Sequence, residues 1–272
     1  MRRQSIAPLV LLVLILLCRP GSAADPASGA WKRSATLAAP EAVQAAAADD
    51  KHVYAIANKL VAKYDRQSGE RVATSTGEAM HLNSGFFNGG KLYCAHSNYP
   101  RKPEQSEIKV LDPASMQLTT FKDFGNFGGS LTWCVRHEGH WWCNFARYGA
   151  DNAATFLVKF DDQWREAARC TYPPEVTSKL MTYSLSGGLW RNGLLLTTDH
   201  DHGQLYCLRL PKAGNVLEFV ETQSVPFTGQ GIAADPQTGG LVGINRAKKQ
   251  IVFATIESDL HRGHHRARAC SF

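Results

Sequence analysis

The sequence predicts an all-β chain that folds into one five-bladed β-propeller. Helical periodicity is nearly absent, and short β-branched, aromatic and aliphatic runs alternate with Gly, Asn, Asp and Pro turns. One such run recurs five times, at spacings of 45 to 49 residues, and ends at Asp65, Asp112, Asp161, Leu210 and Thr255. A repeat of that length with about four strands is typical of propeller blades. A β-sandwich also has many short strands, but nothing in it requires a near-constant period.

A second strand is expected before each recurring run, at residues 52–56, 91–95, 140–144, 193–197 and 240–244. The propeller should span residues 34–258. The last repeat lacks a fourth strand, and residues 34–40 are an apolar segment without a blade of their own. We expect this N-terminal strand of the mature chain to close the last blade, because closure removes an exposed sheet edge.

The first 23 residues have the pattern of a signal peptide. Arg2 and Arg3 precede nine uninterrupted apolar residues at 9–17, and small residues follow at 21–24. Nine residues form a helix of only about 14 Å, too short to span a bilayer. Cys18 lacks the small preceding residue that a lipid anchor needs. We expect a secreted or periplasmic protein without membrane insertion, with a linker at 24–33 and a flexible basic tail at 259–272.

The net charge of +6 comes from the two ends of the chain. The 272 residues include 30 Lys and Arg against 24 Asp and Glu. Six of the arginines lie in the leader and the tail, at Arg2, Arg3, Arg19, Arg262, Arg266 and Arg268. The body is therefore neutral, which argues against a nucleic-acid partner. We expect a monomer.

Two of the six cysteines outside the leader are predicted to pair. Glu138-Gly139 has the pattern of a two-residue hairpin turn, which places Cys134 opposite Cys143. Opposing side chains are close enough there for a disulfide, and we predict one between these two residues. The alternative is two free thiols packed in a sheet.

The candidate site lies on one face of the disc. In four-stranded blades the inner strand starts, and the second strand ends, on the same face around the central channel. Imidazoles and amides concentrate at these positions. The predicted catalytic residues are His81, His96 and His200, and the predicted substrate-binding residues are Asn83, Asn98, Trp133, Asn144, Arg147, Asp201, Gln230 and Asn245.

A divalent metal is one predicted use of these residues, with His81, His96, His200 and Gln230 as ligands. Imidazoles suit Zn²⁺, Mn²⁺ or Fe²⁺, whereas Ca²⁺ would prefer the carboxylate and amide oxygens nearby. Without a metal, the histidines could act as acid and base. The chain has no Gly-rich phosphate loop, nucleophile elbow or Cys-x-x-Cys pair, so no nucleotide or flavin is expected.

Each candidate also has a structural interpretation. The asparagines could cap strand ends or form turns. Trp133 and Trp190 could pack between blades instead of forming a saccharide platform, and residues 199–202 could be a solvated loop.

The motifs His81-Leu-Asn-Ser-Gly85, His96-Ser-Asn-Tyr-Pro100, Ser186-Gly-Gly-Leu-Trp190, His200-Asp201 and Gly229-Gln-Gly-Ile232 resemble a group of exported bacterial β-propellers often labelled cycloisomerase. The resemblance spans about His81 to Arg246 and implies the fold more than an activity. More loosely, the chain is similar to five-bladed glutaminyl cyclase propellers, but it does not match their active-site carboxylates. Three histidines and a glutamine also resemble the metal ligands of some propeller polysaccharide lyases in composition, though not in spacing.

Three functions follow from this sequence. The first is an exported enzyme of the hydrolase or lyase type, acting on a small polar or carbohydrate-derived substrate. The second is a non-catalytic propeller that binds a small molecule or saccharide at the same face. The third is a scaffold in which the histidines are structural.

Overall fold

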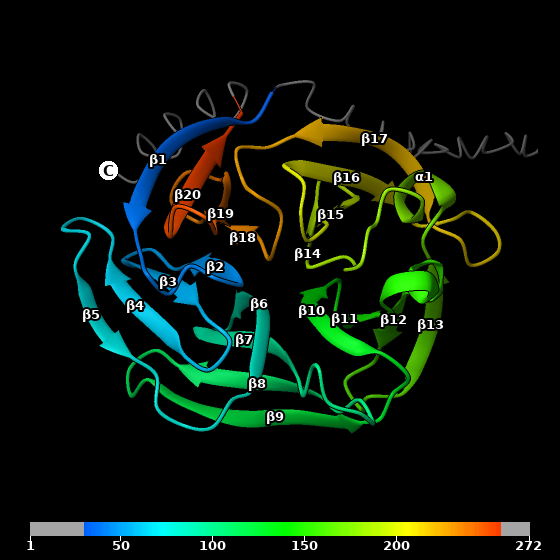
Figure 1. Cartoon of the computed structure of the whole chain (residues 1–272), viewed down its shortest axis with the longest axis horizontal. Coiled ribbons are helices and arrows are strands. Elements are labelled where there is room, and N and C mark those ends of the chain that lie inside the picture. The colour runs from blue at the N-terminus through cyan, green and yellow to red at the C-terminus, as the bar shows by residue number, and fades with distance from the viewer. Residues whose placement is uncertain (1–29, 257–272) are drawn as a thin grey trace, which may run out of the picture.

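The computed structural model describes residues 30–256, which form five four-stranded antiparallel sheets arranged in a ring (Figure 1). Each sheet is one blade of a five-bladed β-propeller, as the repeat predicts. The described residues contain only one short 3₁₀ helix, η1 (Gly149–Ala154), and one four-residue α-helix, α1 (Pro174–Thr177).

The strands of each blade follow one another from the channel outward. Blade 1 contains β2 (Ala45–Ala48), β3 (His52–Ile56), β4 (Val61–Asp65) and β5 (Arg71–Thr74). Blade 2 contains β6 (His81–Asn88), β7 (Lys91–Ser97), β8 (Ser106–Asp112) and β9 (Gln117–Gly125). Blade 3 contains β10 (Ser130–His137), β11 (His140–Ala146), β12 (Phe156–Phe160) and β13 (Glu166–Thr171).

Blade 4 contains β14 (Gly187–Arg191), β15 (Leu194–Thr198), β16 (Gln204–Arg209) and β17 (Glu218–Ser224). Blade 5 contains β18 (Ala233–Ala234), β19 (Leu241–Asn245), β20 (Gln250–Thr255) and, as its outer strand, β1 (Lys32–Ala38). The predicted strands at 91–95, 140–144 and 193–197 agree with β7, β11 and β15 to within two residues.

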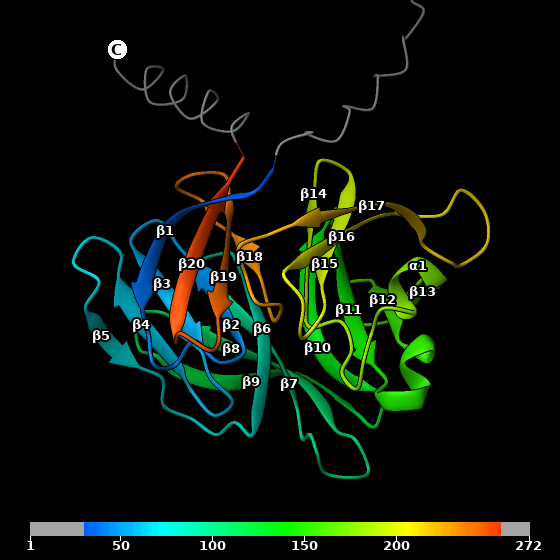
Figure 2. The ribbon, with the colours of Figure 1, turned by 45° about the horizontal axis from the view of Figure 1, so that its top comes forward.

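The N-terminal strand closes the ring, as predicted. β1 pairs antiparallel with β20, from Lys32 opposite Thr255 to Ala38 opposite Gln250. Figure 2 shows β1 lying along β20 with the ring turned. Because the first strand completes the last blade, β20 has a hydrogen-bonded partner on each side and no exposed edge there.

The two ends of the chain lie outside the described residues. The predicted signal peptide, most of the predicted linker, the predicted tail, Cys18 and Cys270 all fall there. Within residues 30–256 we find no helix long and apolar enough to cross a membrane.

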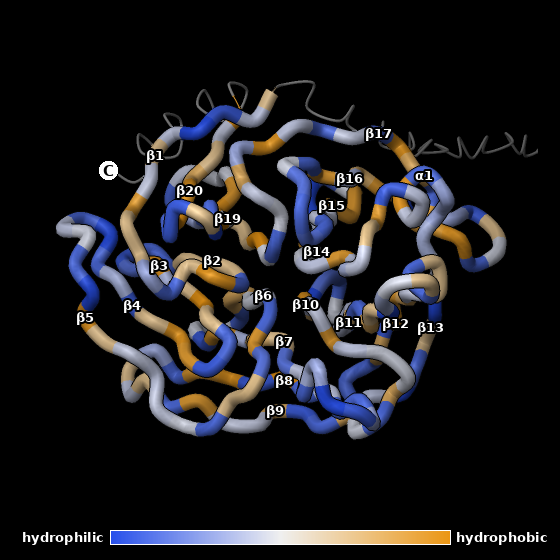
Figure 3. Tube along the Cα trace, in the orientation of Figure 1, coloured by the Kyte–Doolittle hydropathy of each residue, from blue (hydrophilic) through white to orange (hydrophobic). Residues whose placement is uncertain are grey.

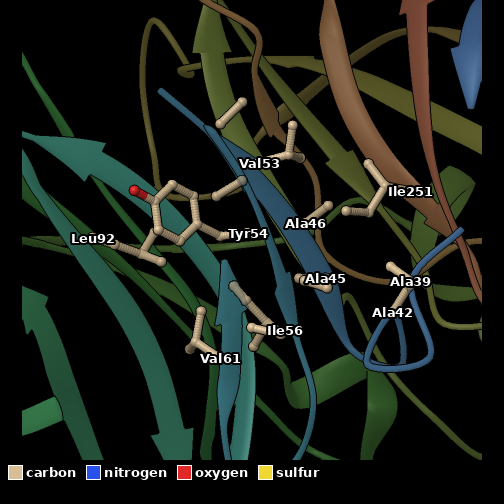
Figure 4. Packing of buried hydrophobic residues seen from close by; sticks show 14 of the residues in the cluster. Ala39, Ala42, Ala45, Ala46, Val53, Tyr54, Ile56, Val61, Leu92 and Ile251 are labelled. Carbon is tan, nitrogen blue, oxygen red and sulfur yellow. The ribbon is translucent and has the colours of Figure 1, made fainter. Parts of the chain in front are cut away.

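The hydrophobic core lies between the faces of neighbouring blades. Figure 4 shows one such contact, in which Tyr54 and Ile56 on β3 pack near Leu92 on β7. The tube in Figure 3 is hydrophobic along β2 and hydrophilic along the turn between β4 and β5. The four residues of β2 are all alanine and all buried, and Ala45 lies so close to Gly231 that a methyl group there would come within 2.6 Å of the Ala45 Cβ.

Gly231 packs tightly against the inner strands of blades 1 and 2, and we call this contact the waist of the channel. A methyl group on Gly231 would come within 2.6 Å of the Ala45 Cβ and 2.7 Å of the Ser84 Cβ. The Gly231 amide donates to the Gln44 carbonyl at 2.9 Å, which joins blades 5 and 1 directly. The waist therefore separates two cavities, one at each mouth of the channel.

The cysteine register is confirmed, but the disulfide is not formed. Cys134 lies opposite Cys143 across the β10–β11 hairpin, and the Glu138-Gly139 turn pairs His137 with His140. Both cysteines are buried free thiols in the structure. Burial raises the pKa of both thiols. Both side chains belong to the hydrophobic cluster that packs between blades 2 and 3.

Candidate functional site

One mouth of the channel holds a cavity of about 500 Å³, which is within the range of small-molecule sites. All five blades or their connections contribute to it. We call this cavity the polar mouth, and its lining residues are Gln44, Asn58, Met80, His81, Asn83, Tyr99, Pro100, Arg101, Thr132, Tyr148, Tyr183, Ser184, Ser186, His200 and Arg246.

The other mouth holds a cavity of about 450 Å³, where the inner strands end. We call it the apolar mouth, and its lining includes Phe86, Phe87, Val135, Leu189 and Trp190. The predicted gathering of polar residues on one face of the disc therefore corresponds to one of two cavities with different chemistry.

Two β-bulges bring polar side chains to the polar mouth. The pairing of β6 with β7 shifts register after Leu82, and the pairing of β10 with β11 shifts after Leu131. The residues that follow, Asn83 and Thr132, line the cavity. A bulge leaves one residue without a cross-strand partner and changes the direction of nearby side chains, which explains why these two strands present polar groups near their starts.

Asn144, a predicted substrate-binding residue, lies beneath this mouth instead of lining it. It is completely buried. Its Nδ2 donates to the Thr132 Oγ1 at 2.9 Å, and its Oδ1 accepts from the Tyr172 hydroxyl at 2.7 Å. The Thr132 hydroxyl in turn donates to the Leu185 carbonyl at 2.6 Å. Asn144 therefore fixes the bulged Thr132 against the β13 side of blade 3.

A buried carboxylate shapes the loop that carries His200. Asp199 is 2% exposed, and its Oδ1 accepts from the backbone N–H groups of Asp201 at 3.0 Å and His202 at 2.7 Å. Its Oδ2 accepts from the Tyr206 hydroxyl at 2.9 Å and lies 2.7 Å from the His202 Nδ1. These bonds form a tight turn on a rigid strand end.

The predicted binding residue Gln230 supports the same loop from below. Gln230 is 1% exposed, and its Nε2 donates to the His200 carbonyl at 3.1 Å. Gly229 has φ +76°, and a Cβ there would lie 2.5 Å from the same carbonyl oxygen. Glycine is required at this position by both conformation and space.

The His200 ring lies between a carboxylate and a guanidinium. Its Nδ1 is 2.6 Å from the Asp201 Oδ1, and its Nε2 is 3.2 Å from the Arg246 Nη1. Arginine can only donate, so Nε2 accepts and Nδ1 carries the proton that is donated to Asp201. Tyr183 stacks on the ring with a centroid distance of 4.0 Å. The contacts of His200 thus orient the ring, with Nδ1 toward Asp201 and Nε2 toward Arg246.

His81 faces the same cavity and is also favoured as a neutral base. Burial lowers its pKa, and the positive charge of Arg246 lowers it further. Tyr99 packs beside the His81 ring at a centroid distance of 5.2 Å, and Tyr148 packs beside Tyr99 at the same distance. Burial also raises the pKa of Tyr148 to about 12, so its hydroxyl stays protonated.

His96 does not line the polar mouth. It is 8% exposed, and its Nε2 accepts from the Met80 backbone N–H at 2.9 Å. Its Nδ1 lies 3.1 Å from the Glu107 Oε2. Burial and the nearby Lys109 ammonium lower the His96 pKa to about 4, although Glu107 opposes the shift. Both ring nitrogens face protein groups, so His96 is separated from the predicted pair His81 and His200.

The predicted metal ligands do not fit a metal centre. The His200 ring has partners at both nitrogens, the His96 Nε2 accepts from the Met80 N–H while its Nδ1 faces the Glu107 carboxylate at 3.1 Å, and the Gln230 amide is bonded to a backbone carbonyl. Among residues 30–256, no three His, Cys, Asp or Glu side chains form a group that could hold a metal ion. We therefore derive no chemistry through a metal at this mouth.

Asn98 and Asn245 form hydrogen bonds that close turns, which is the structural interpretation given above for the asparagines. Asn98 donates from Nδ2 to the Pro103 carbonyl at 2.9 Å, and its Oδ1 accepts from the Gln105 N–H at 2.9 Å. The Asn245 Oδ1 accepts from the Lys248 N–H at 3.0 Å. Neither asparagine lines the polar mouth.

Trp133 and Arg147 also lie away from the cavity lining. Trp133 is completely buried between blades 3 and 4, where Gly188 leaves space for its ring. The Arg147 backbone N–H donates to the Thr155 Oγ1 at 3.0 Å. Trp190 lies at the apolar mouth. A saccharide platform made of tryptophan is therefore absent from the described part of the polar mouth.

Several lining residues were missed by the sequence argument. Tyr99 and Arg246 follow second strands, at ends that the strand pattern places on this face, but nothing in the sequence distinguishes them from their neighbours. Tyr183 lies in the long connection between β13 and β14, and Gln44 precedes an alanine run, so no strand pattern placed either one. Gln44 donates to the Asn58 Oδ1 at 2.6 Å at the edge of the cavity.

No protein-family model matches this chain, and no curated protein matches it. Among solved structures, the chain is similar to the glutaminyl cyclase of Myxococcus xanthus, with a TM-score of 0.58, 10% identity, and coverage of 84% of this chain and 97% of that chain. A structure described as the mitotic checkpoint complex aligns with a TM-score of 0.43 and 10% identity, over 90% of this chain and 98% of that one. The first similarity supports the propeller fold and the looser resemblance seen in the sequence.

Proposed function

We propose that this chain is an exported enzyme that performs acid–base chemistry on a small polar or carbohydrate-derived substrate at the polar mouth. The observation that carries the proposal is that His81 and His200 line one cavity, with His200 held in a defined tautomer by Asp201. Perturbed titratable groups that converge in a cleft are typical of catalytic sites. The structural similarity to an enzyme of this fold is compatible with the proposal but supplies no residue roles.

His81 would be the general base in this proposal. Its lowered pKa keeps the imidazole neutral near pH 7, so it can accept a proton from a substrate carbon or from an attacking water molecule. The Arg246 guanidinium, bonded to the His200 Nε2, would stabilise the negative charge that develops on the substrate. Both hydrolase and lyase reactions use this combination of a base and a fixed positive charge.

The test is turnover of a panel of neutral and acidic oligosaccharides, followed by NMR, with the wild type and with His81→Ala and His200→Ala. We expect either substitution to reduce kcat/KM by a factor of about 10²–10⁴, the usual contribution of a general acid or base. Because His81 must be neutral, kcat/KM should rise with pH through an apparent pKa below 6.5, the ordinary value for histidine. If both variants kept the activity of the wild type, the proposed catalysis by these histidines would be refuted.

The alternative is a non-catalytic ligand-binding propeller that uses the same cavity. The observation in its favour is the aromatic lining, in which Tyr99, Tyr148 and Tyr183 pack against each other or against a histidine. Aromatic faces with polar tips suit saccharide rings. Saturable binding of an oligosaccharide without turnover at any pH would favour this function over the enzyme.

A further inference from the structure

We infer that the ligand of the polar mouth is a small hydroxylated carboxylate whose anionic group is bound by Arg246. This inference rests on the proposed function in one respect, because it concerns the same cavity. It adds the chemical class of the ligand, which neither the fold nor the histidines define.

The charge of the lining is the first observation. The residues that line the polar mouth include Arg101 and Arg246 but no Asp or Glu. Burial and the charge of Arg246 lower the pKa of His81, and Arg246 also donates to the His200 Nε2 at 3.2 Å. The cavity wall therefore carries net positive charge in a chain whose body is neutral, and such a cleft concentrates anions.

The partners of Arg246 are the second observation. Its Nη1 donates to the His200 Nε2 at 3.2 Å, and within residues 30–256 the guanidinium forms no ion pair with a carboxylate. By contrast, Arg66, also a partly buried arginine, pairs with the buried Asp235 at 2.7 Å. A guanidinium has five N–H donors, so most of those of Arg246 are left for a ligand. Its planar fork matches a carboxylate in bidentate geometry.

The uncharged residues of the lining indicate that the ligand carries hydroxyl groups as well as a carboxylate. Hydroxyls from Tyr99, Tyr183 and Ser186, with amides from Gln44 and Asn58, line the same cavity as the guanidinium. Such groups exchange hydrogen bonds with alcohols. A polyhydroxylated acid the size of a monosaccharide satisfies both the charge and the hydroxyl-rich wall, whereas an apolar acid would satisfy only the charge.

Isothermal titration calorimetry with D-glucuronate and D-glucuronamide tests the inference, because these two probes differ in charge but hardly in shape. We expect glucuronate to bind at least tenfold more tightly than glucuronamide. Arg246→Gln should abolish that difference, and Arg246→Lys should keep part of it. Arg136→Gln is the matched control, since Arg136 lines the apolar mouth and should leave both affinities unchanged.

Inorganic phosphate is a competing probe in the same titrations. A carboxylate site is supported if phosphate displaces glucuronate only at concentrations far above the dissociation constant of glucuronate. Equal affinity for glucuronate and glucuronamide, an unchanged preference in a folded Arg246→Gln variant, stronger binding of phosphate, or no binding of either sugar derivative would overturn the inference. None of these outcomes decides the acid–base proposal, which depends on turnover in the His81 and His200 variants.

Discussion

The two mouths of the channel are built from the same five inner strands but differ in their connections. At the apolar mouth, β6–β7, β10–β11 and β14–β15 join through two-residue turns, for example Glu138-Gly139 with φ of +48° and +76°. At the polar mouth, the segments between β7 and β8, β11 and β12, and β13 and β14 are long enough to fold over the channel. Tight turns of this kind expose little beyond their own backbone.

The difference shows where a propeller has freedom to carry chemistry. The tight turns fix strand register and leave the apolar mouth lined by the ends of core strands, such as Phe86 and Val135. The longer connections add Tyr99, Tyr148 and Tyr183 to the polar mouth without changing the strands. Function is concentrated on loops that a rigid scaffold positions, as in other folds. Four substitutions or conditions test this contrast, from the largest expected effect to the smallest.

The waist is expected to give the largest effect, because it supports both mouths. Gly231→Ala would place a methyl group 2.8 Å from the Ser84 Cα, where backbone must move. We expect the free energy of unfolding in urea to fall by about 3 kcal/mol, at the upper end of overpacking costs. Gly139→Ala, in an open turn with φ +76°, should cost only about 1 kcal/mol. Equal losses would mean that the two cavities are not separated by a close-packed waist.

The buried network under the polar mouth should give the next largest effect. Asn144→Leu leaves the buried Tyr172 hydroxyl without its acceptor and the Thr132 hydroxyl without one of its two partners, at a cost of about 2–3 kcal/mol. Adding Tyr172→Phe should recover part of that loss, because it removes one of the unpaired groups. A double-mutant cycle from urea unfolding measures the coupling. Strict additivity would contradict the network.

Acid sensitivity should belong to the polar side of the ring. The folded pKa of His96 is lowered to about 4 from 6.5 by burial and by Lys109. The unfolded chain therefore binds more protons between these two values, and stability must fall as the pH falls from 6.5 toward 4. His96→Gln should flatten this part of a plot of urea midpoint against pH. A slope that persists unchanged in this variant would assign the effect to other groups.

The smallest effect is expected at the rim of the apolar mouth. Arg136 pairs with Asp162 at 2.7 Å, but the Asp162 side chain is 58% exposed. Surface ion pairs of this kind contribute less than about 1 kcal/mol. Arg136→Gln should therefore lower the midpoint of thermal unfolding only slightly. If Arg136→Gln lowered the thermal midpoint as much as Gly231→Ala does, the rim of this mouth would be more than a solvated edge.

Part of the candidate site was predictable because propeller geometry fixes which strand ends share a face. His81, Asn83 and His200 were placed correctly at one mouth by counting strands. His96 was not, because a single position on β7 decides whether a side chain enters the channel or packs toward Glu107 on β8. Trp133 shows the same limit, since its direction depends on the bulge at Thr132 and on the space left by Gly188.

The sequence by itself determined the number of blades, the strand positions and the closure of the ring, because turn residues and hydrophobic runs recur at a near-constant period. It also determined the Cys134–Cys143 register through the Glu138-Gly139 turn. Tertiary structure alone decided the rest. The alanines at 45–48 favour a helix by intrinsic propensity, yet they form the inner strand β2 because they pair with β3 and pack inside the ring. The pairing of Arg246 with His200, which are 46 residues apart, likewise exists only because the ring brings blades 4 and 5 together.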